Sequence, residues 1–108
     1  MSAFHENPAE TLIRDALRLV IDPEVGLNIV DLGLVYRVEL SPRYLLVEIT
    51  TTSPACPMSS LIRDEVRALA RKVVPANVHI DIVLVWEPPW SPAMMSDAAR
   101  EMLRWPVH

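Results

Sequence analysis

The sequence has little of what several classes of protein require. A single cysteine, Cys56, excludes an internal disulfide, and one thiol with three scattered histidines does not make a four-ligand metal site. There is one lysine, Lys72, no basic run, and a formal net charge of -4, which excludes a surface that tracks phosphates. We therefore expect no nucleic-acid partner.

Long hydrophobic runs are also absent. The longest purely apolar run covers residues 82–86, whereas a bilayer-spanning helix needs about 20 residues. The first residues do not combine a basic region with an apolar stretch, as a secretory signal would. We expect a cytoplasmic protein with no membrane partner.

What the chain does contain is enough apolar sequence for one core. Hydrophobic residues make up 51% of the 108 positions, and apolar residues recur in every segment between the ten prolines. This length supports one compact core and is short for two. The sequence predicts a single domain over residues 1–108.

The apolar spacing predicts six elements. The spacing predicts helices over residues 8–20, 57–73 and 96–104, and strands over residues 34–40, 45–51 and 78–86. Ser41-Pro42-Arg43 joins the first two strands as an antiparallel hairpin. The predicted fold class is α+β, in two layers, with the order α-β-β-α-β-α and the helices mainly on one face of a three-stranded mixed sheet.

This order brings three loops together. A right-handed crossover through the second helix makes the second and third strands parallel, so their carboxyl ends meet the start of the first strand at one edge. We expect Cys56, the loop of residues 86–90 and the loop of residues 22–33 to converge there.

Cys56 lies between Pro54 and Pro57, directly before a predicted helix. The free N–H groups and the positive dipole end of a helix start favour a thiolate, which suits a reactive or metal-binding sulfur. A small apolar residue filling the junction of strand and helix explains the position equally well. Position alone leaves both interpretations open.

Polar and aromatic side chains surround the predicted edge. Candidates are the acids Asp22, Glu24 and Asp31, the hydroxyls Thr52 and Ser53, and the indoles Trp86 and Trp90. The acids and hydroxyls suit a metal, a bound sulfur or a partner, but loop acids are often turn formers and threonines often β-formers. The tryptophans suit protein recognition or a cap over the core.

A thiol enzyme would need a histidine within hydrogen-bond reach of the sulfur. The interior candidate, His79, precedes the third strand, whereas Cys56 follows the second. A strand of about eight residues at about 3.3 Å each separates them by about 20 Å or more. We therefore expect no catalytic residues and no enzymatic turnover.

Three runs, in this order, carry a resemblance to a known family. They are residues 22–36 (DPEVGLNIVDLGLVY), 52–58 (TSPACPM) and 85–92 (VWEPPWSP), followed by Met95-Ser96. Together they resemble the SufT-like and PaaD-like metal-sulfur cluster assembly family over nearly the whole chain. The family usually has threonine where this chain has Ser53 and glycine where it has Ala55. With no second cysteine, the chain resembles a single-domain SufT-like member.

The resemblance implies an iron-sulfur assembly fold and an accessory role in iron-sulfur protein maturation. It aligns the family's functional cysteine with Cys56, its acidic pair with Asp22 and Glu24, and its hydroxyl pair with Thr52 and Ser53. Expected partners are the iron-sulfur assembly machinery, client apoproteins and a second copy in a homodimer. The expected cofactor is a labile, transient iron-sulfur cluster shared through Cys56. The alternative is an adaptor that links a cluster carrier to its client without holding the cluster.

Overall fold

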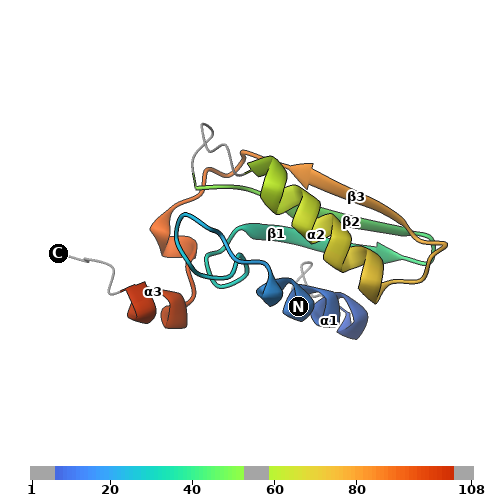
Figure 1. Cartoon of the computed structure of the whole chain (residues 1–108), viewed down its shortest axis with the longest axis horizontal. Coiled ribbons are helices and arrows are strands. Elements are labelled where there is room, and N and C mark those ends of the chain that lie inside the picture. Colours follow the sequence, from blue (N-terminus) through green and yellow to red (C-terminus); the bar gives the residue numbers. More distant parts are fainter. Residues whose placement is uncertain (1–6, 53–58, 104–108) are drawn as a thin grey trace.

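The computed structural model describes residues 7–52 and 59–103 (Figure 1). In chain order the elements are α1 (Pro8–Ala16), the 3₁₀ turn η1 (Leu17–Leu19), β1 (Val35–Ser41), β2 (Tyr44–Ile49), α2 (Ser59–Val73), β3 (His79–Leu84), the 3₁₀ turn η2 (Pro92–Met94) and α3 (Asp97–Leu103). The predicted α+β class and the predicted order of elements are confirmed.

The three strands form one sheet in the order β1-β2-β3. β1 and β2 are antiparallel across the tight turn at Pro42 and Arg43, and β2 and β3 are parallel. Val38, Val47 and Ile82 share one register row, and all three are buried. Figure 1 shows α2 crossing in front of the sheet, with α1 below β1 in this view.

The start of α1 follows from a capping box. The Asn7 side chain accepts a hydrogen bond from the Glu10 N–H (2.8 Å), and Glu10 Oε1 accepts one from the Asn7 N–H (2.9 Å). Glu10 Oε2 also accepts a hydrogen bond from the Leu40 N–H at 2.7 Å, which ties the helix to β1. The cap therefore fixes both the start of the helix and its position on the sheet.

Three predicted elements end earlier in the structure. The second strand, predicted to end at residue 51, ends at Ile49. The first helix is α-helical only to Ala16 and then tightens into η1, where the Val20 N–H bonds the Leu17 carbonyl at 3.0 Å. A tighter last turn of this kind is common at helix ends. The third strand ends at Leu84 and not at Trp86, because its neighbour β2 ends at Ile49, the residue that pairs with Leu84.

α2 packs on the sheet through a narrow apolar row. Ile62, Val66 and Ala70 are fully buried, one turn apart. Leu61 and Val73, which are also apolar residues of this helix, are 47% and 45% exposed. A three-stranded sheet that is also shared with α1 leaves room for only one row of α2 to be covered.

None of the helices in residues 7–52 and 59–103 is long and apolar enough to cross a membrane.

Candidate functional site

The predicted convergence of loops is present in the described residues. At the end of β2, the Thr50 N–H bonds the Leu34 carbonyl, and the Val85 N–H bonds the Ile49 carbonyl, both at 2.8 Å. The loop before β1, the end of β2 and the loop after β3 therefore meet at one end of the sheet, on the left of Figure 1. We call the surface formed by residues 21–34, 50–52 and 85–96 the loop edge. Cys56 and Ser53 lie outside the described residues.

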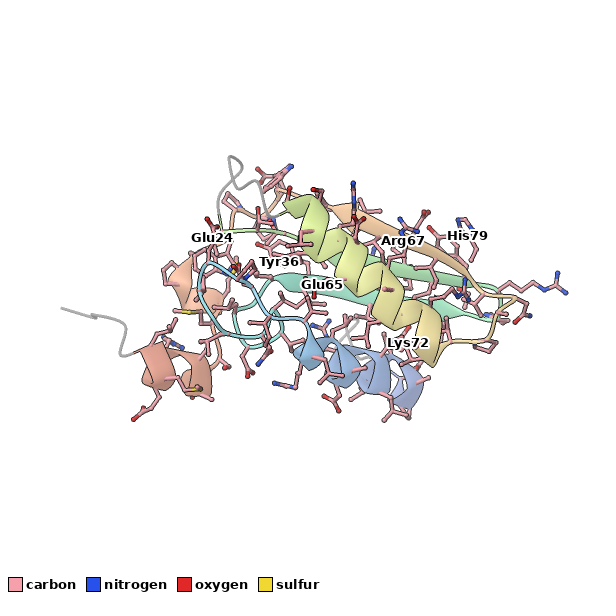
Figure 2. The ribbon with its side chains drawn as sticks, in the orientation of Figure 1. Glu24, Tyr36, Glu65, Arg67, Lys72 and His79 are labelled. Carbon is pink, nitrogen blue, oxygen red and sulfur yellow. The ribbon has the colours of Figure 1, made fainter. Side chains whose placement is uncertain are left out.

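Asp22 forms the turn that opens the first loop. Its Oδ1 accepts a hydrogen bond from the Glu24 N–H (2.8 Å), and its carbonyl accepts one from the Gly26 N–H (2.7 Å). The residue is only 1% exposed, yet Oδ2 has no hydrogen-bond partner in the described part of the chain. A buried carboxylate oxygen without a donor is costly and rare in folded proteins. Glu24, two residues on, has an exposed side chain (Figure 2).

Asp31 is fully engaged in holding the loop. Its Oδ1 lies 2.7 Å from the Arg18 guanidinium, and its Oδ2 accepts a hydrogen bond from the Asn28 amide at 2.9 Å. These hydrogen bonds, that of Asn28 first, hold the pKa of Asp31 below its usual value. The Asp31 carbonyl also accepts a hydrogen bond from the Ser96 N–H at 2.8 Å. Asp31 thus connects the loop to η1 and to the start of α3.

Tyr36 and Trp90 fasten the proline-rich loop to the rest of the loop edge. The Tyr36 hydroxyl donates to the Pro88 carbonyl (2.8 Å), and the Trp90 indole N–H donates to the Leu32 carbonyl (2.7 Å). Burial raises the pKa of Tyr36, with a smaller contribution from Glu87. Tyr36 was not among the predicted site residues. Its place in a predicted strand is a signal that could have found it, because the hydroxyl of a buried tyrosine usually forms a hydrogen bond.

The remaining predicted site residues, Trp86 and Thr52, differ from their neighbours in how far they are exposed to solvent. Trp86 is 41% exposed at the loop edge, so its indole is accessible to another molecule. Thr52 is half-buried just after β2, whereas its neighbours Thr50 and Thr51 are buried at 1% and 3% exposure. The two buried threonines belong to the end of the core, and Thr52 is the described hydroxyl of the run that reaches the surface.

The described residues contain no group of three or more histidine, cysteine or acidic side chains that could hold a metal ion. His79 begins β3 and pairs with Tyr44 at the start of β2, so it lies at the end of the sheet opposite the loop edge. The distance predicted between His79 and Cys56 stays a prediction, because Cys56 lies outside the described residues. The loop edge therefore supplies hydrogen bonds, one buried carboxylate and an exposed indole.

Comparison with known proteins agrees with this arrangement. Residues 10–82 match the family described as iron-sulfur cluster assembly protein. The chain is 41% identical over 83 residues to the Fe-S protein maturation auxiliary factor SufT of Staphylococcus aureus, covering 76% of this chain and 93% of that protein. It is 42% identical over 90 residues to the Fe-S protein maturation auxiliary factor YitW of Bacillus subtilis, covering 82% and 86%.

A solved structure has the same fold. The domain of unknown function DUF59 from Bacillus anthracis superposes with a TM-score of 0.84 at 37% sequence identity, covering 91% of this chain and 93% of that one.

Proposed function

The chain belongs to the family of iron-sulfur cluster assembly proteins, and we propose that it is an accessory factor that helps to assemble iron-sulfur clusters or to transfer them to client proteins. The observation that carries this proposal is the family match, which spans the loop before β1, the end of β2 and most of β3. We propose the cytoplasm as its compartment, because a lone thiol carrier needs reducing conditions. No enzymatic turnover is part of the proposed role.

Cys56 is the proposed cluster ligand, with the cluster as cargo. Iron-sulfur clusters are typically held by four ligands, and each chain supplies one cysteine. A cluster would therefore be shared between two Cys56 thiolates of a homodimer, with small thiols or a client completing the coordination. Such a cluster is labile, and lability favours transfer to a client.

The loop edge supports this role through its polar groups. The free Oδ2 of buried Asp22 would accept a hydrogen bond that a cluster-bearing loop or a client supplies. Thr52 and Ser53 would donate hydrogen bonds to cluster sulfurs. Asp31 would keep the loop in place, while Glu24, Trp86 and Trp90 would contact the assembly machinery or the client.

An adaptor that holds no cluster is the second candidate. It is favoured by the exposure of Trp86, whose indole is open to a partner at the loop edge. In this role Cys56 would be a contact residue, and the exposed part of the loop edge would bind a cluster carrier and its client.

Anaerobic reconstitution with iron and sulfide tests the proposal. The parent chain, Cys56→Ser and the double variant Cys56→Ser/Ser41→Cys are compared by visible absorbance and iron per chain. Ser41 is exposed and ends β1 away from the loop edge, so the double variant keeps one thiol per chain in the wrong place. We expect at most one cluster per two chains in the parent and none in either variant.

Two other outcomes have clear meanings. Equal cluster uptake by the double variant would show that any accessible thiol suffices, and the site proposed at Cys56 would be wrong. No uptake by the parent would reject the carrier and leave the adaptor.

A further inference from the structure

A second surface lies at the opposite end of the sheet from the loop edge. A hollow of about 420 Å³ is lined by Arg67 and Arg71 of α2, by residues 76–78 and by the first two residues of β3. β3 begins at this hollow with His79 and runs to the loop edge, where it ends at Leu84. A molecule bound in the hollow would therefore leave the loop edge uncovered.

Both arginines are held in place by backbone carbonyls. Arg67 Nη1 donates to the Ile80 carbonyl at 3.1 Å, and Arg71 Nη2 donates to the Pro75 carbonyl at 2.6 Å. Each bond uses one of the five N–H donors of a guanidinium. Neither arginine forms an ion pair with an acidic residue in the described ranges, although the chain has 14 acidic residues for 10 basic ones.

Asp81, the acidic residue that follows the lining residues of β3, is engaged elsewhere. Asp81 accepts a hydrogen bond from the Tyr44 hydroxyl at 2.7 Å and lies 3.7 Å from the His79 ring. That ring stacks on Tyr44, with ring centroids 5.8 Å apart. Asp81 therefore contacts Tyr44 and His79, and in the described residues it forms no ion pair with Arg67 or Arg71.

We infer that this hollow binds an acidic segment of a partner protein, whose carboxylates bond Arg67 and Arg71. Guanidinium groups already held in one geometry lose less side-chain entropy on binding, and their remaining donors match a carboxylate in pairs. Most lining residues are exposed, so the hollow is an open groove, and its volume exceeds what one small anion fills. The exposed Ala76 adds an apolar contact for the peptide between its charges.

The test is a fluorescence anisotropy titration of the full chain with a labelled nine-residue peptide of Glu-Leu-Glu repeats. A matched peptide with glutamine in place of glutamate shows whether binding depends on the negative charge of the peptide. The variants are Arg67→Gln, Arg71→Gln and both together, with Lys72→Gln as the control. Lys72 is on the same helix and loses the same charge, but it is not part of the hollow lining, and Figure 2 shows it on the other side of α2 from Arg67 and His79.

Because an exposed ion pair changes a binding constant by up to about fivefold, we expect each arginine variant to weaken binding about threefold and the double variant about tenfold. Lys72→Gln should change it less than twofold, and the glutamine peptide should not bind measurably. Arg71→Lys keeps the charge without the paired donors and should fall between the parent and Arg71→Gln. Urea midpoints of all variants check that the fold is intact.

Other results would overturn the proposal. Equal weakening by Lys72→Gln would mean that only net charge matters. Displacement of the peptide by an equimolar concentration of inorganic phosphate would assign the hollow to small oxyanions. Self-association that the double variant abolishes would make a second copy of the chain the occupant.

Discussion

Replacing Gly33 by alanine tests how the loop edge is built. Gly33 has φ +79°, and a Cβ there would lie 2.8 Å from the Met94 carbonyl carbon, with the Met94 oxygen closer still. Gly26, in the same loop, has φ +85° and nothing within 4 Å of its Cβ position. The two glycines share the same backbone requirement and differ in what surrounds them.

That difference sets the expected magnitudes. An alanine in the left-handed region costs about 1–2 kcal/mol. Overpacking a close contact adds about 1–3 kcal/mol. Gly26→Ala should therefore lower the free energy of unfolding by about 1–2 kcal/mol, and Gly33→Ala by about 2–5 kcal/mol. The backbone strain and the change in the unfolded chain are common to both variants, so the difference isolates the contact with Met94.

Urea unfolding followed by tryptophan fluorescence measures both variants, and Trp90 reports directly on the loop edge. We expect Gly33→Ala to be less stable than Gly26→Ala by about 1–3 kcal/mol, with an altered native-state emission. Equal destabilisation by the two substitutions would refute the close approach of Gly33 to Met94.

Three further predictions concern the contacts of the loop edge. Asp22→Ala removes the side-chain acceptor of the turn and should lower the free energy of unfolding in urea by about 1–3 kcal/mol. Asp22→Asn keeps Oδ1 and should lower it less. An equal loss for both variants would contradict the hydrogen bond from the Glu24 N–H to Asp22 Oδ1. Trp90→Phe should cost about 1–2 kcal/mol because it leaves the Leu32 carbonyl unpaired, whereas Trp86→Phe, at an exposed position, should change stability by less than about 0.5 kcal/mol. Asp31 has a pKa below its unfolded value, so its stabilisation is present at neutral pH and is lost as the pH falls through the lowered pKa, below about 4. Between pH 6 and pH 3 the parent should therefore lose more stability than Asp31→Asn, and identical losses would show that this carboxylate contributes nothing.

Much of the fold follows from local signals. The Asn7-Pro8 cap marks the start of α1, and alternating residues around Pro42 mark the hairpin. The convergence of loops follows from topology, because a parallel pair formed by β2 and β3 brings their carboxyl ends to one edge.

The contacts within the loop edge could not be predicted in this way. Tyr36 and Pro88 are separated by 52 residues, and their hydrogen bond depends on how two loops pack. Burial of Asp22 has the same origin, because the same Asp-Pro sequence is equally suited to an exposed turn. Arg67 and Arg71 lie within the predicted helix of residues 57–73, but their hollow forms only once the 75–78 turn folds back toward α2.

The most direct test of the proposed maturation role is the specific activity of a [4Fe–4S] enzyme in bacterial cells that lack their own SufT-like factor. The parent chain, Cys56→Ser and Cys56→Ser/Ser41→Cys are expressed at equal levels, and activity is divided by the amount of enzyme protein. We expect the parent to restore the activity and both variants to fail, since the thiol must lie at the loop edge. Full restoration by Cys56→Ser would contradict the role of this thiol, and no restoration by the folded parent chain would contradict the role in maturation itself.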